Sequence, residues 1–90
     1  MTYRLLYVSV RGHRYLAGGP TVHPVDGVPA GAGSTFGDFP AVEHHVRGEL
    51  RGISAIHQVL VIDTDGTVVR RGHRSGPGGT RDRWTWHTPT

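Results

Sequence analysis

Two copies of the tetrapeptide Arg-Gly-His-Arg, at 11–14 and 71–74, are the residues best suited to binding an anion. Each copy follows an apolar run that is typical of a β-strand. Guanidinium groups bind phosphate and carboxylate through paired hydrogen bonds, and imidazole adds a further donor. If both strands end side by side, the two copies converge on one site. The residues of this predicted site are Arg11, His13, Arg14, Arg71, His73 and Arg74. The alternative is coincidence, because a short repeat arises easily in a chain rich in arginine and glycine.

Metal-independent catalysis on a phosphodiester is a second candidate chemistry. A ribonuclease or phosphodiesterase needs a base, an acid and a cation beside the phosphate. His57, His73 and Glu43 have the right types for the acid and the base, and Arg71 and Arg74 for the cation. No motif accompanies these residues, so the enzyme is the alternative to a binding protein.

The seven histidines of the chain lack the spacing of a local metal site. His44 and His45 are adjacent, so on a helix they point about 100° apart. A metal would need distant ligands to converge, for example His57 with His73 and a third residue. There is no cysteine to form a thiolate site. We therefore predict neither a metal nor another cofactor.

The segment 81–87 places two arginines next to two tryptophans and a histidine. Aromatic platforms flanked by arginine are typical of proteins that bind single-stranded nucleic acid. Trp86 is the candidate stacking residue. We expect Trp84 in the core instead, because so small a domain needs its large apolar side chains there.

Composition predicts one small basic domain, 1–90, with a formal net charge of +3. All ten basic residues are arginine, and lysine and asparagine are both absent, which points to GC-rich coding as much as to selection for guanidinium. The N-terminus lacks the pattern of a signal peptide, and the longest apolar run, 59–62, is far shorter than a membrane span. We expect a cytoplasmic protein without membrane contact. A homodimer would help so short a chain, because it buries little of its surface alone.

Periodicity predicts an α+β fold in which one helix, 38–51, packs on one face of an antiparallel sheet of four to five strands. The strands are expected at 3–10, 15–17, 53–63, 67–71 and 84–87. The first strand has apolar residues on both faces, and the unbroken apolar run 59–62 indicates a strand covered on both faces. Asp38 and Pro40 are suited to the start of the helix, and Gly52 to the left-handed position at its end. A glycine- and proline-rich loop, 18–37, precedes the helix, and a second flexible loop covers 75–81.

The turn between the third and fourth strands sets the position of two histidines. Asp63 to Thr67 is predicted to form a three-residue hairpin loop with Gly66 in the left-handed conformation. This register places His57 opposite His73. A two-residue loop would place Gln58 there instead, and we expect the first arrangement.

These features favour a small non-enzymatic binding module that presents an arginine and histidine face to an anionic partner. The partner would be nucleic acid or the acidic surface of another protein. One alternative is the compact ribonuclease or phosphodiesterase described above. The other is an accessory protein that binds and modulates an enzyme through the glycine-rich loop.

Overall fold

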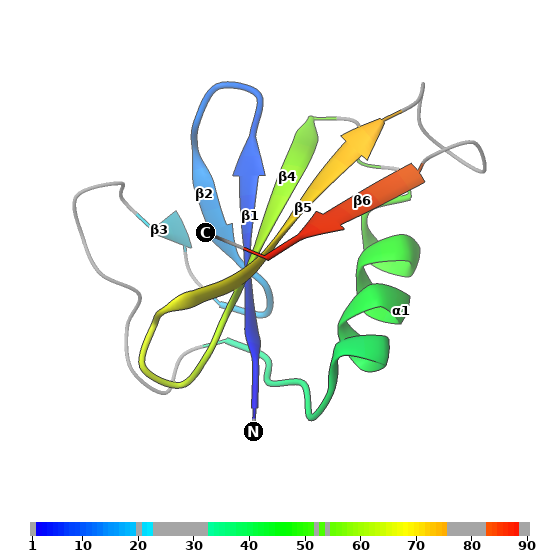
Figure 1. Cartoon of the computed structure of the whole chain (residues 1–90). Coiled ribbons are helices and arrows are strands. Elements are labelled where there is room, and N and C mark those ends of the chain that lie inside the picture. Colours follow the sequence, from blue (N-terminus) through cyan, green and yellow to red (C-terminus); the bar gives the residue numbers. More distant parts are fainter. Residues whose placement is uncertain are drawn as a thin grey trace.

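The fold is a single antiparallel sheet with one helix, and a computed structural model describes residues 2–19, 21–22, 33–51, 53, 55–75 and 83–88 of it. The strands are β1 (Arg4–Ser9), β2 (Arg14–Leu16), β3 (Thr21–Val22), β4 (Ile56–Ile62), β5 (Val68–Ser75) and β6 (Arg83–His87), and the helix is α1 (Phe39–Glu49). The strand order is β3-β2-β1-β4-β5-β6 (Figure 1). The predicted α+β class is confirmed, with five strands of three or more residues and the two-residue β3.

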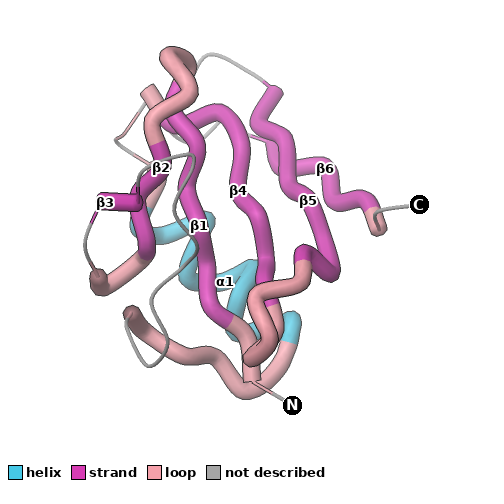
Figure 2. Tube along the Cα trace, turned by 90° about the vertical axis from the view of Figure 1, so that its left-hand side faces the viewer, coloured by secondary structure: helices cyan, strands magenta, loops and turns pink. Residues whose placement is uncertain are grey.

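Side chains of β1 and β4 alternate between two apolar clusters, as the sequence pattern predicts. Figure 2 shows α1 lying on one side of the sheet. On this side, Leu5 and Tyr7 join Val59 and Val61 in the larger cluster. The same cluster contains the buried side chains of the helical segment, which are Val42, Val46 and Leu50. The opposite side has a smaller cluster made by Leu6, Leu16 and Leu60. β4 is therefore buried on both faces and lies inside the sheet, as its unbroken apolar run predicts.

The start of α1 follows the capping residues in its sequence. Asp38 is extended and accepts a hydrogen bond from the Ala41 amide at 2.9 Å, and Pro40 lies in the first turn. The C-cap residue Leu50 follows the helix, and its amide donates to the Val46 carbonyl. Gly52, expected as the left-handed terminal residue, lies outside the described residues. None of the helices in the described ranges is long and apolar enough to cross a bilayer.

The hairpin between β4 and β5 has the predicted loop but a different register. Asp63 donates its amide to the Thr67 carbonyl at 3.0 Å, and Gly66 is left-handed with φ of 85°. The pairing then shifts by one residue between Ile62 and Val61, which places Gln58 opposite His73. The prediction that His57 faces His73 is therefore wrong. A bulge within the strands, which turn chemistry does not reveal, produced the shift.

The second Arg-Gly-His-Arg copy, 71–74, is also not at a strand end as expected. It lies inside β5, which continues to Ser75 and pairs with β6 from Arg71 to Ser75. Of the two predicted loops, residues 20, 23–32 and 76–81 lie outside the described part of the chain, and Thr21–Val22 forms β3.

Candidate functional site

The outer face of β5 and β6, opposite α1, carries a row of exposed cationic and polar side chains. From Arg71 to Ser75 and along the whole of β6, every second residue is exposed. We call this surface the cationic face. Its residues are Arg71, His73, Ser75, Arg83, Thr85 and His87.

Strand pairing brings these residues together in three rows. Arg71 lies opposite His87, and His73 lies opposite Thr85. The rings of His73 and His87 are in edge contact, with centroids 5.7 Å apart. Neither β5 nor β6 contains a carboxylate, so no acidic side chain of these strands neutralises the arginines. The face offers guanidinium, imidazole and hydroxyl donors to an anion.

The first Arg-Gly-His-Arg copy contributes to this side of the sheet mainly through Arg14. The path across the sheet runs from Arg14 in β2 to its partner Val8 in β1. Val8 is paired with Gln58 in β4, and Gln58 with His73 in β5. Directly paired residues share a face, so Arg14 and His73 lie on the same side. Three strand spacings separate them by about 14 Å. Arg11 and His13 are exposed in the turn between β1 and β2.

Arg74, a predicted anion ligand, points to the other side and binds the end of the helix. Its Nη1 donates to the Ile53 carbonyl at 2.6 Å, and its Nη2 donates to the Leu50 carbonyl. These bonds satisfy carbonyls that follow the last helical turn. Arg70 shares this inner face, and its guanidinium lies 4.0 Å from the centre of the Phe39 ring at the start of α1. No feature of the sequence pattern indicated that these arginines bind the helix.

Both tryptophans also lie on the inner side, partly buried against the larger cluster. Trp86 makes an edge contact with Phe39, with ring centroids 5.1 Å apart. Its ring also covers Gly72, the residue directly across in β5. The centre of the Trp84 ring lies 5.0 Å from Cζ of Arg74. The predicted stacking residue Trp86 is therefore on the opposite side of the sheet from the cationic face.

The three residues proposed for acid–base catalysis lie on separate elements. His73 is exposed on the outer face of β5, whereas Glu43 is on α1 and lies 3.7 Å from Arg47. His57 is where the β1–β4 pairing skips a residue, between Gln58 and Ile56. Within the described ranges, no three histidine, cysteine, aspartate or glutamate residues are grouped closely enough to hold a metal ion.

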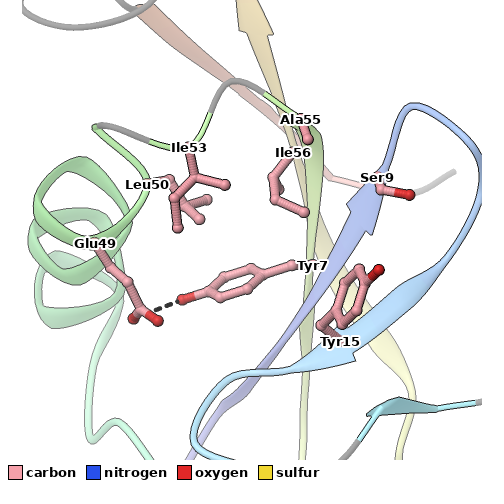
Figure 3. Close-up of a pocket in the computed structure, with 8 residues that line it drawn as sticks. All are labelled: Tyr7, Ser9, Tyr15, Glu49, Leu50, Ile53, Ala55 and Ile56. Carbon is pink, nitrogen blue, oxygen red and sulfur yellow. Dashed lines mark hydrogen bonds between the residues drawn. The ribbon is translucent and has the colours of Figure 1, made fainter.

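A pocket of about 320 Å³ lies on the inner side, between the end of α1 and the strands β1 and β2. Tyr7 crosses it and donates its hydroxyl hydrogen to Glu49 Oε2 at 3.0 Å (Figure 3). His45, one helical turn before Glu49, contacts the same oxygen through Nε2. Burial raises the pKa of Tyr7, and the neighbouring Glu49 charge and hydrogen bond raise it further. Tyr7 therefore stays a neutral donor over the physiological range.

The pocket was not predicted from the sequence, although a tyrosine on the inward face of a strand is a weak signal for a buried hydroxyl partner. The described residues thus offer two candidate sites on opposite sides of the sheet, which are the cationic face and an apolar pocket lined by one carboxylate. Comparison with protein-family models, with curated proteins and with solved structures found no match for this chain.

Proposed function

We propose that the chain is a small binding module that attaches to the phosphate backbone of nucleic acid through its cationic face. The observation that carries the proposal is the alternation of paired residues along β5 and β6. It gathers Arg71, Arg83, His73 and His87 on one exposed surface and sends Arg74 to the helix side. Of the described arginines in β5 and β6, Arg71 and Arg83 are exposed to solvent. Arg70 and Arg74 contact the helical segment instead.

The spacing of the donors suits a polyanion better than a single small anion. Exposed residues recur about every 6.6 Å along a strand and about every 4.8 Å across strands. Several phosphates can therefore be contacted at once, with guanidinium making paired bonds and Thr85 and Ser75 adding hydroxyl contacts. Side-chain hydroxyls and arginines are among the groups that contact nucleic-acid phosphates in known complexes.

Binding through this face would not depend on base sequence. The described strands place their tryptophans on the inner side, so the cationic face has no tryptophan platform on which bases could stack. Contacts made only to phosphates fix position and carry no sequence information. We therefore expect similar affinities for oligonucleotides of different sequence and a steep dependence on salt.

The test replaces Arg71 and Arg83 together by alanine and measures binding to a labelled oligonucleotide over a range of salt concentrations. Each lost phosphate contact should lower the slope of log affinity against log salt by about one, so the double variant should lose about two. We expect affinity at low salt to fall by about 10-fold to 100-fold, as for the loss of two charged contacts.

The matched control replaces Arg47 and Arg51, which are exposed at the C-terminal end of the α1 segment, and removes the same charge. If both double variants lose the same oligonucleotide affinity, the loss reflects net charge alone and the proposal is wrong. Polyglutamate is the second probe. If the Arg71 and Arg83 pair governs binding to polyglutamate but the chain does not bind the oligonucleotide, the partner is an acidic protein surface instead.

A further inference from the structure

The pocket between α1 and β1 has the size, the lining and the charge of a small-ligand site. Its volume of about 320 Å³ is at the small end of the range for ligand pockets. Four of its lining residues contribute aliphatic surface: Leu50, Ile53, Ala55 and Ile56. Its polar groups are few, as in sites that orient a ligand by one or two contacts.

The pocket is open to solvent on one side. Ile53 and Tyr15 line it and are 44% and 38% exposed, which is high for large apolar side chains. Figure 3 shows Ile53, from the segment after α1, and Tyr15, from β2, near the Tyr7 side chain in the lining of the pocket. Leu50 and Ile56 form the inner walls and are buried. A ligand would therefore enter past the exposed side chains and cover them.

Glu49 gives the pocket its polarity. Within the part of the chain that the structure describes, Tyr7 and His45 both contact Oε2 of this carboxylate, which leaves Oε1 to accept from a ligand. The Tyr7 hydroxyl hydrogen is already committed to Glu49. The site thus offers an acceptor with negative charge beside two tyrosine rings, and both features attract a cation.

We propose that this pocket binds a small organic ammonium ion, an amine on a compact apolar body of about one ring. The apolar body would fill the space against Leu50 and Ile56, and the ammonium group would reach Glu49 Oε1. A carboxylate ligand of the same shape would meet the charge of Glu49 instead. This site lies on the side of the sheet opposite the cationic face and does not depend on the function proposed for that face.

Three probes of nearly equal shape test the proposal: 2-phenylethylamine, 2-phenylethanol and 3-phenylpropionate. Affinities are measured by titration in two-dimensional NMR, following the amides of Ile53, Ala55 and Ile56. We expect the amine to bind about 10-fold or more tightly than the carboxylate, with the alcohol between them, since one charge-assisted hydrogen bond distinguishes them. Equal affinities for amine and carboxylate, or shifts confined to residues away from the pocket, would overturn the proposal.

Two charge variants locate the effect. Glu49→Gln keeps an oxygen that can accept from Tyr7, and it should lower amine affinity by about 5-fold to 20-fold while leaving the alcohol unchanged. Glu43→Gln removes the same charge from the same helix at a position outside the pocket and should leave all three affinities unchanged. Ala55→Phe fills the pocket and should weaken all three probes. An amine that binds Glu49→Gln as well as the original chain excludes Glu49 as its partner and overturns the proposal.

Discussion

The two copies of Arg-Gly-His-Arg have the same residues and very different structures. In the first copy, residues 11–13 form the turn between β1 and β2, where Gly12 is left-handed with φ of 83°, and Arg14 begins β2. The second copy, 71–74, is an extended part of β5, where Gly72 is buried beneath Trp86. The neighbours of a tetrapeptide in the fold, and not its sequence, decide which of its side chains are free to bind a ligand.

The last arginine of each copy gives the sharpest contrast. Arg14 is half-buried at the start of β2, whereas Arg74 is 9% exposed and hydrogen-bonded to two carbonyls at the end of α1. A positive charge at a helix C-terminus is also favoured by the helix dipole. Replacing Arg74 therefore breaks buried hydrogen bonds of a charged group that joins β5 to the helix.

Arg74→Ala should give the largest effect, a loss of about 2 to 4 kcal/mol in the free energy of unfolding. Arg14→Ala should change it by less than about 0.5 kcal/mol, as is usual away from buried networks. Urea denaturation of both variants measures the difference. Arg74→Lys keeps the charge but cannot reproduce the two-pronged contact, so its stability should lie between Arg74→Ala and the original chain. Equal stability of the two alanine variants would mean that Arg74 does not hold α1.

The glycines of the two copies are expected to resist substitution for different reasons. A β-carbon at Gly72 would lie 2.7 Å from Cζ3 of Trp86, whereas at Gly12 it would meet no atom within 4 Å. Gly72→Ala should cost about 1 to 3 kcal/mol through overpacking, and Gly12→Ala about 1 kcal/mol through backbone strain. Thermal melts of both variants give the comparison.

A second substitution separates the two causes. Trp86→Leu removes the ring that covers Gly72, so Gly72→Ala should cost clearly less in that background. Gly12→Ala should cost the same with or without Trp86. Gly12→Asn should be tolerated better than Gly12→Ala, because asparagine enters the left-handed region more readily. If Gly72→Ala costs as much in the Trp86→Leu background as in the original chain, the steric explanation is wrong.

Local sequence signals predicted the parts of the fold that depend on local chemistry. Asp38 and Pro40 mark the start of α1, and the alternation of Leu5, Leu6 and Tyr7 predicts two buried faces. The Asp63 to Thr67 loop also formed as its glycine predicts. These features are decided within a few residues, so the sequence alone contains them.

The position of the histidines in the β4–β5 hairpin depended on contacts that a single sequence does not contain. A one-residue shift beyond the loop changed the partner of His73 from His57 to Gln58. Every residue of β5 beyond this shift faces a different residue of β4 from the one that the loop alone predicts. The helix-binding role of Arg74 likewise depends on where α1 ends in space, which composition and spacing do not encode.

Arg11 and Arg71, the first arginines of the two copies, give the smallest expected effect on stability. They test whether ligand binding is confined to the cationic face. Arg11 and Arg71 are both exposed, so neither alanine variant should change the free energy of unfolding by more than about 0.5 kcal/mol. Their positions differ, because Arg71 lies within the cationic face, opposite His87, whereas Arg11 lies in the turn beyond β1. Any difference between the two variants in ligand binding therefore reports on the surface and not on folding.

Arg71→Ala should weaken oligonucleotide binding by about 3-fold to 10-fold and lower the salt slope by about one. Arg11→Ala removes the same charge and should weaken binding by less than about 2-fold, because only the long-range field of the protein changes. Arg14→Ala should fall between the two, since Arg14 shares the face of His73. Fluorescence anisotropy at two salt concentrations distinguishes these outcomes. A loss for Arg11→Ala as large as that for Arg71→Ala would contradict a binding surface confined to the cationic face.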